Sequence, residues 1–199
     1  MNSILCLLIL WYIWMIQTFF AVKNKYRTTS AAFVLLTIVL FPVEWQTASI
    51  VIHPAFLLLY GGGLLIFPLI PSDRKRKVFY FSAAFAFLFA AVRMAEWYEP
   101  VVFLFGHSVT YLSIFSVLFL VFGNSLHERV SIAVTACSSG EILSRIHLSR
   151  LTEDVILGDP SLIKIILFLI LVIHIYDAAT KGANILKRNE NVTISSLPR

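Results

Sequence analysis

Long apolar stretches recur along this chain of 199 residues, and the first of them, residues 3–22, contains no charged side chain. A helix needs about 20 apolar residues to cross the roughly 30 Å hydrocarbon core of a bilayer. Hydrophobic residues make up 59% of the chain and charged residues 14%, against about 45–50% and about 25% in soluble domains. A soluble domain of this size could not bury so much apolar surface. The sequence therefore predicts an integral membrane protein and excludes a soluble enzyme, a nucleic-acid-binding domain and a secreted disulfide scaffold.

The spacing of the apolar stretches predicts an all-α fold, a polytopic transmembrane bundle of about seven helices in a single domain of residues 1–180. The segment 130–148 is the doubtful span, because it is rich in small residues and carries Glu141 and Arg145. On insertion scales, an Asp, Lys or Arg at the centre of a spanning helix makes the free energy of membrane insertion less favourable by about 2.5–3.5 kcal/mol. Residues 181–199 are predicted to form a short basic cytoplasmic tail. The expected spans are 3–22, 30–45, 49–70, 78–97, 101–122, 130–148 and 161–179.

The distribution of basic residues predicts the orientation of the bundle and supports the doubtful span. Cytoplasmic segments of membrane proteins carry an excess of Lys and Arg. With seven spans, the basic run from Arg74 to Lys77 and the basic tail fall on one side, and the other side has only Arg93 and Arg150. Without the span at 130–148, the tail would move to the other side, against the rule. We therefore expect the N-terminus outside and the C-terminus inside.

Ionisable residues within a membrane are the first place to look for a function. Glu141 and Arg145 lie four residues apart and share one face of a helix, where they either lock the structure or serve a function. The predicted topology brings other polar residues to the same outer half, and we hypothesise that some of them line an outward-facing cavity. The alternative is that each lies at the headgroup boundary, where a charge costs little. The candidate site residues are Glu141, Arg145, His53, His107, Arg93 and Glu96, with Glu44 and Lys164 in the same outer half.

The expected span 49–70 contains prolines and a glycine triplet that loosen a helix. Irregular helices in membranes line cavities or pack tightly against a neighbour. Close packing against the small-residue segment 130–148 and a gating hinge are both open interpretations. The residues concerned are Pro54, Gly61, Gly62 and Gly63.

The chain shows no sign of a cofactor, a metal site or a nucleic-acid partner. Its two cysteines, Cys6 and Cys137, lie in apolar stretches without companions at ligand spacing, whereas zinc and iron–sulfur sites need about four ligands. The basic residues follow the pattern of membrane topology, so we expect contact with the lipid bilayer and no nucleic acid. A membrane-protein partner and a homo-oligomer both stay open.

Three hypotheses of function follow. The first is a non-enzymatic membrane protein that acts through helix or protein contacts, which the absence of common enzyme motifs favours. The second is a small transporter or channel with a polar cavity around Glu141 and Arg145. The third is an intramembrane enzyme that uses Ser139, which precedes Gly140 as in rhomboid-type proteases and would need a histidine as general base.

The N-terminal sequence MNSILCLLILWYIW, the loop KNKYR at residues 23–27 and the overall length resemble the YphA-like membrane proteins of Bacillus-type bacteria. The resemblance extends over essentially the full chain. It implies a multi-pass protein in the plasma membrane of a Gram-positive bacterium. It implies no activity and marks no site residues.

Overall fold

The structure, a computed structural model, describes residues 2–19, 25–47, 50–98, 103, 106–148 and 155–195. These residues form mostly α-helix, as the sequence predicts, with a 3₁₀ turn and three short strands. The helices are α1 (Asn2–Phe19), α2 (Lys25–Leu40), α3 (Pro54–Ile66), α4 (Ser72–Tyr98), α5 (His107–Phe122), α6 (Leu126–Leu148) and α7 (Pro160–Ser195). The 3₁₀ turn η1 is Phe67–Leu69, and the strands are β1 (Trp45–Thr47), β2 (Ile50–Ile52) and β3 (Val155–Leu157).

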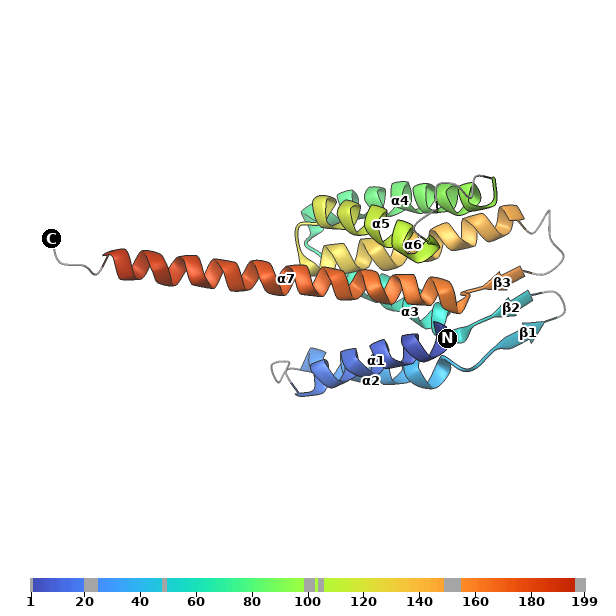
Figure 1. Ribbon diagram of the computed structural model, residues 1–199, viewed down its shortest axis with the longest axis horizontal. Helices are drawn as coiled ribbons and strands as arrows, with labels where there is room; N and C mark the ends of the chain where they lie inside the picture. The colour runs from blue at the N-terminus through green and yellow to red at the C-terminus, as the bar shows by residue number, and fades with distance from the viewer. Residues whose placement is uncertain are drawn as a thin grey trace.

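Successive helices run in alternating directions along the long axis of the molecule (Figure 1). The strands lie at one end, which we call the sheet end, together with the start of α1 (Figure 1). The opposite end carries η1 and the turn at residues 123–125, and α7 runs on beyond it (Figure 1). The start of α1 and the end of α7 therefore lie at opposite ends of the bundle.

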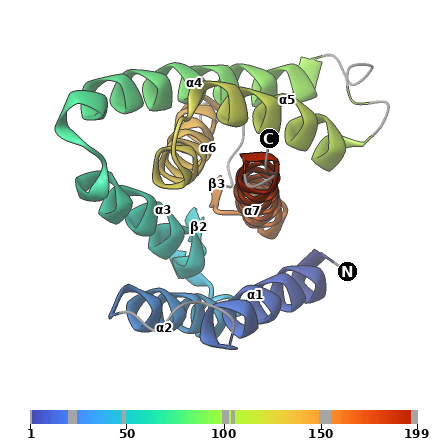
Figure 2. The same ribbon diagram turned by 90° about the vertical axis from the view of Figure 1, so that its left-hand side faces the viewer.

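The helix α6 lies inside the bundle and packs on α3, α4, α5 and α7 (Figure 2). All its residues from Val130 to Ser138 are buried. Small side chains allow the close approach, because a Cβ at Gly140 would lie only 2.7 Å from the carbonyl oxygen of Ala86 on α4. The segment that insertion energetics make doubtful is thus enclosed by other helices.

Aromatic side chains join α4 to α5. Tyr111, Phe115 and Phe119 are spaced four residues apart, so they share one face of α5, and all three are fully buried. Their rings meet those of Phe85 and Phe89 on α4, with centroid distances of 5.3 Å for Phe89–Tyr111, 5.2 Å for Phe89–Phe115 and 5.7 Å for Phe85–Phe119. Such pairs add about 0.5–1.5 kcal/mol each beyond the area they bury. This packing holds the end of α4 beside the start of α5.

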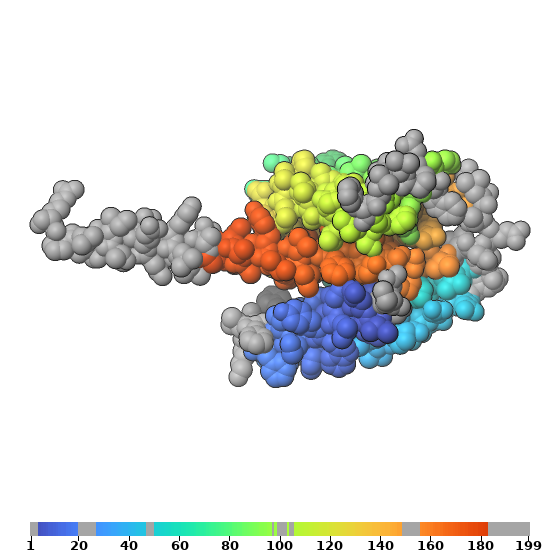
Figure 3. All heavy atoms as spheres, in the orientation of Figure 1, coloured from blue at the N-terminus to red at the C-terminus, as the bar shows by residue number. Residues whose placement is uncertain are grey.

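The outer surfaces of the helices are rich in large exposed apolar side chains, as expected of a surface that faces lipid. Examples are Leu8 and Phe19 on α1, Leu65 on α3, Phe79 on α4, Val121 on α5 and Ile175 on α7. Within the described residues, Ser72–Glu96 and Pro160–Gly182 are long and apolar enough to cross a bilayer, whereas α1, α2, α3 with η1 and α5 provide shorter apolar helices. The helices α1 and α2 lie together beside α7 (Figures 2 and 3).

A small sheet, which the sequence did not predict, accompanies the helices. Strand β1 pairs antiparallel with β2, with Trp45 opposite Ile52, and β2 pairs parallel with β3, with Ile50 opposite Val155. Both β2 and β3 are rich in β-branched residues, which favour extended backbone. The expected spans 30–45 and 49–70 therefore each include part of this sheet.

The helix ends also differ from the expected spans. Pro54 starts α3 instead of interrupting a longer helix, because His53 before it has an extended backbone (φ −87°, ψ 114°) and the first helical position suits proline. At the C-terminus, α7 continues through Ser195, so most of the expected tail 181–199 continues this helix. The first residues of the expected span 101–122 and the last of 3–22 lie largely outside the described residues.

Candidate functional site

Five of the predicted site residues meet in one ion-paired cluster at the sheet end. Arg93 and Glu96 come from the last turns of α4, His107 from the first turn of α5, and Glu141 and Arg145 from the C-terminal part of α6. Four ion pairs link them in the order His107–Glu96–Arg93–Glu141–Arg145. We call this cluster the Arg–Glu network.

Glu141 lies at the centre of the Arg–Glu network, and its side chain is 0% exposed. Its Oε1 accepts a hydrogen bond of 2.7 Å from Nε of Arg145, one helical turn further along α6. Its Oε2 lies 3.3 Å from Nε of Arg93 on α4. That contact has ion-pair distance without hydrogen-bond alignment, so Oε2 lacks a hydrogen-bond donor among the described residues. Two guanidinium groups thus compensate one buried carboxylate.

Glu96 extends the Arg–Glu network toward α5. Its Oε2 accepts hydrogen bonds of 3.0 Å from Nη1 of Arg93 and 3.0 Å from the hydroxyl of Tyr111. Its Oε1 lies 3.3 Å from Nε2 of His107, whose side chain is 57% exposed. The sequence motifs do not single out Tyr111, although it lies one turn after His107 and therefore on the same face of α5.

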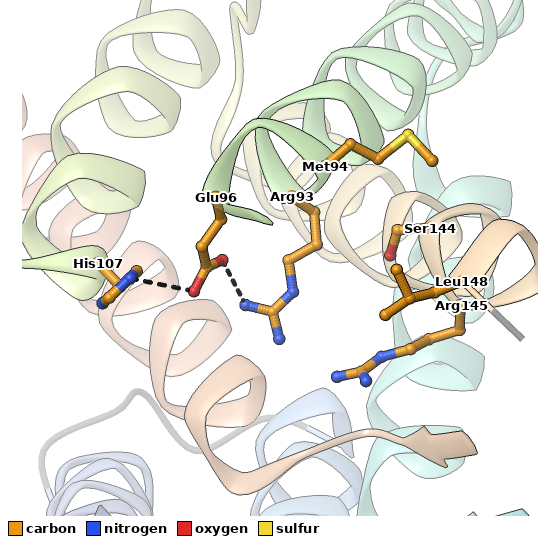
Figure 4. A pocket seen from close by; sticks show the side chains of 7 residues that line it. All are labelled: Arg93, Met94, Glu96, His107, Ser144, Arg145 and Leu148. Atoms are coloured by element: carbon orange, nitrogen blue, oxygen red, sulfur yellow. Dashed lines mark hydrogen bonds and ion pairs between the residues drawn. The ribbon is translucent and has the colours of Figure 1, made fainter. Parts of the chain in front are cut away.

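Two adjoining pockets open over the Arg–Glu network, and Arg93, Glu96 and His107 line both. The first, of about 480 Å³, lies between α4, α5 and α6, and Figure 4 shows Arg93 and Arg145 pointing into it from different helices. The second, of about 360 Å³, extends toward the start of α7. We call the two together the sheet-end pocket. The first part is also lined by Met94, Ser144, Arg145 and Leu148, and the second by Gly106, Ser108, Val109, Ser161, Lys164 and Ile165.

The structure places the sixth candidate, His53, away from the Arg–Glu network. His53 is buried directly before α3, where its backbone N–H donates a hydrogen bond of 3.1 Å to the carbonyl oxygen of Leu157 in β3. The residue therefore joins α3 to the sheet, and it lines neither part of the sheet-end pocket.

The glycine triplet of α3 has a different environment at each position. A Cβ at Gly61 would meet nothing within 4 Å, and one at Gly62 would clash with the ring of Phe33 on α2. A Cβ at Gly63 would lie 2.8 Å from Cγ1 of Val134. The carbonyl oxygen of Gly63 accepts a hydrogen bond of 3.2 Å from the hydroxyl of Ser131. In this structure α3 therefore lies in close contact with α6 at Gly63.

A family model described as YphA-like integral membrane protein matches residues 2–194. The chain belongs to the YphA-like family. No curated protein and no solved structure matches it. Membership confirms the prediction of an integral membrane protein, and it makes the large apolar side chains on the outer helix faces a lipid-facing surface.

In this YphA-like protein, the groups that an intramembrane serine protease would use have other partners. Ser139 donates a hydrogen bond of 3.3 Å to the hydroxyl of Tyr60. Nδ1 of His174, on α7, lies 2.8 Å from the carbonyl oxygen of Ile170. Within the described part of the chain, no three His, Cys, Asp or Glu side chains gather as metal ligands. The Arg–Glu network and its pocket are therefore the strongest candidate site in the described residues.

Proposed function

We propose that this chain is a seven-span protein of the bacterial plasma membrane, with its sheet end outside, that binds a small polar solute in the sheet-end pocket. The distribution of charge supports this orientation, because cytoplasmic segments are rich in Lys and Arg. At the end opposite the sheet lie the cations Arg27, Arg74, Lys75, Arg76, Lys77, Arg129 and Lys181. The described cations of the sheet end are Arg93, Arg145 and Lys164, accompanied by Glu44, Glu96, Glu141 and Asp159.

The observation that carries the proposal is the burial of Glu141 beneath an open pocket that both of its arginine partners line. Burying charged groups is costly, and well-packed apolar side chains often stabilise a protein equally well. Ionisable residues within a membrane bundle therefore mark binding sites and transport routes. A purely locking pair would not need a pocket of about 480 Å³ beside it, a size within the range of small-molecule sites.

Cysteine accessibility tests this proposal. In a full-length protein that carries Cys6→Ala and Cys137→Ala, we would place a cysteine at Met94, which lines the pocket. We expect a membrane-impermeant thiol reagent to label Met94→Cys from outside in intact cells. The matched controls are Ala133→Cys, in the buried part of α6, which should stay unlabelled, and Asp73→Cys, exposed at the opposite end, which should react only after the cells are opened. If Met94→Cys stays unlabelled in folded protein before and after opening, the pocket takes no solute.

The second candidate function is contact with another membrane protein, and the course of α7 favours it. This helix runs past the other helices at the end opposite the sheet (Figure 1), and a helix that extends from a bundle offers a surface to a partner. Truncation after Gly182 would then remove in-cell crosslinks of the full chain to other proteins and leave the bundle folded. Crosslinks that survive this truncation would exclude the part of α7 after Gly182 as the contact surface.

A further inference from the structure

We infer that the sheet-end pocket selects an oxyanion, a carboxylate or phosphate group, and that Arg145 is the residue that binds it. This inference rests on the proposed function, because it assumes that a solute enters the pocket. It adds the chemical class of that solute, which follows from the geometry of Arg145 and the charge of the pocket lining.

Arg145 is oriented for binding by its own ion pair. Its Nε donates to Oε1 of Glu141 at 2.7 Å, which fixes one edge of the guanidinium group. Among the described residues, the two terminal nitrogens have no hydrogen-bond or ion-pair partner, and the side chain lines the pocket and is 18% exposed. A guanidinium group presents its terminal N–H groups as a planar fork that matches the two oxygens of a carboxylate or phosphate. Arg145 therefore offers a pre-oriented fork to the pocket.

The charges around the sheet-end pocket favour an anion over a cation. Three cations line it, namely Arg93, Arg145 and Lys164. Glu96 is the acid in the lining, and it is already engaged by Arg93, Tyr111 and His107. Glu141 is 0% exposed, so its carboxylate offsets part of the charge of the two arginines but does not contact the solute. The charged side chains that face the solute are thus mainly cationic, and a cleft lined by one sign of charge concentrates ions of the opposite sign.

The remaining lining residues limit the size and character of the ligand. Met94 and Leu148 give the first part of the pocket apolar walls, and Ser144 also lines it. Pockets of a few hundred Å³ accept small molecules. The lining thus fits an oxyanion attached to a short apolar group, whether a free organic acid or phosphate ester or the headgroup phosphate of a lipid.

The test compares two thiol reagents at Met94→Cys in the same background without native cysteines. Methanethiosulfonates of similar size carry either a sulfonate, which is itself an oxyanion, or a trimethylammonium group. At each cysteine, the rate of reaction with the sulfonate reagent is divided by the rate with the trimethylammonium reagent. The value of this ratio at Met94→Cys relative to its value at Gln46→Cys, which is exposed on strand β1, reports the preference of the pocket for an anion. We expect a preference of about tenfold or more for the sulfonate. A ratio equal to that at Gln46→Cys would overturn the inference.

Three arginine variants assign the effect to Arg145. Arg145→Gln should lower the preference toward the value at Gln46→Cys, whereas Arg76→Gln, which removes the same charge from the opposite end, should leave it unchanged. Arg145→Lys keeps the charge and loses the fork, so it provides the test if Arg145→Gln fails to fold. Inorganic phosphate should slow labelling of Met94→Cys in the parent protein and have at least about fivefold less effect in Arg145→Lys, by analogy with the geometric specificity of arginine. Equal protection in both proteins would show that Arg145 is not the binding residue.

The two proposals fail in different ways. If neither reagent reacts with Met94→Cys, the pocket is closed and the proposed function falls. If both reagents react without preference for the sulfonate, the pocket stands and the oxyanion inference falls. A comparison of lipid and detergent separates the two sources of the ligand. A lipid headgroup phosphate would protect Met94→Cys in vesicles that contain phosphatidylglycerol and leave it reactive in a maltoside detergent, which has no phosphate, whereas added inorganic phosphate would protect it in both.

Discussion

At the scale of single residues, Glu141 has the most demanding environment in the described chain, since it is fully buried and pairs with two arginines. Glu141→Gln removes the counterion that Arg93 and Arg145 share and leaves two guanidinium groups facing a neutral amide. Breaking a buried ion pair from one side costs about 3–5 kcal/mol. We expect this loss as a fall in the free energy of unfolding, measured by denaturant titration in detergent.

Ser138→Ala is the matched control for Glu141→Gln. Ser138 lies one turn before Glu141 and is also fully buried, but its hydroxyl has no hydrogen-bond partner among the described residues. Removing an unsatisfied buried polar group is close to neutral or stabilising. We expect a change within about 1 kcal/mol. If both variants lose the same stability, the cost of Glu141→Gln arises from disturbed packing of α6 and not from the lost charge.

A second residue-scale prediction concerns Tyr111, whose hydroxyl donates a hydrogen bond of 3.0 Å to Glu96. Tyr111→Phe removes this bond and preserves the ring that packs on Phe89 and Phe115. Hydrogen bonds to charged groups contribute about 1.5–3 kcal/mol. The free energy of unfolding should fall by about this amount. If Tyr111→Phe lowers the free energy of unfolding by the same amount in a protein that already carries Glu96→Gln, the hydroxyl acts independently of the carboxylate charge.

The sequence predicts which residues are candidates for the site better than it predicts their contacts. Alternating helix directions bring the ends of α4 and α6 and the start of α5 to the same side, which is why Arg93, Glu96 and His107 could be grouped with Glu141. The pairing of Arg93 with Glu141 depends on how α4 and α6 are rotated against each other, and no sequence spacing encodes this rotation. Expected depth in the membrane is the one reason to group His53 with these residues, and His53 lies elsewhere because it joins α3 to the sheet.

At the scale of helices and strands, apolar stretches predict the helices but not where each one ends. Strand β2 lies within an apolar run whose hydrophobicity resembles that of a spanning helix, and a run of this kind does not distinguish strand from helix. Strand β1, which contains Gln46 and Thr47, lies mostly between the expected spans 30–45 and 49–70. The continuation of α7 to Ser195 was not predicted for a different reason. Residues after 181 are mostly polar, so they lack the apolar character by which a spanning helix is recognised.

Helix packing gives a third prediction, at Gly140. A Cβ there would lie 2.7 Å from the carbonyl oxygen of Ala86 and 2.7 Å from Cβ of Phe89, so Gly140→Ala must push α6 away from α4. Overpacking of this kind costs about 1–3 kcal/mol. We expect a lower midpoint of unfolding in detergent and weaker anion preference at the sheet-end pocket, because Arg93 and Glu141 face each other across the same pair of helices.

Gly61→Ala is the control for Gly140→Ala, since it is the same substitution on a helix with nothing within 4 Å of the new Cβ. Alanine is favoured over glycine within a helix by about 0.5–1 kcal/mol. This variant should therefore unfold at the same midpoint as the parent protein or at a higher one. A loss at Gly61 as large as that at Gly140 would mean that the glycines serve backbone flexibility and not close packing.

At the scale of the whole molecule, the position of α6 explains how a segment with several charges can belong to a membrane bundle. The helix carries Glu128, Arg129, Glu141 and Arg145, and it is enclosed by α3, α4, α5 and α7 (Figure 2). Charged residues in membrane proteins face the interior of the bundle, where they pair with each other. The enclosure of α6 includes α7, which follows it in the chain. Membrane insertion of α6 should therefore depend on a helix that is made later.

This dependence gives the last prediction. With seven spans and the N-terminus outside, a reporter enzyme that is active only outside should be active when it is inserted between residues 150 and 151 of the full chain. The same reporter fused to a chain truncated after residue 150 lacks α7, so we expect activity to fall several-fold per molecule. A reporter after residue 100 is the control, because α4 before it is apolar enough to cross alone. At this position, the reporter inserted into the full chain and the reporter fused to a chain truncated after residue 100 should give the same activity. If the inserted reporter at residue 150 is inactive while the control is active, α6 does not cross, and the end of α6 lies on the cytoplasmic side. The pairing of Arg93 with Glu141 across the sheet end could then not form in the membrane, since their helix ends would lie on opposite sides.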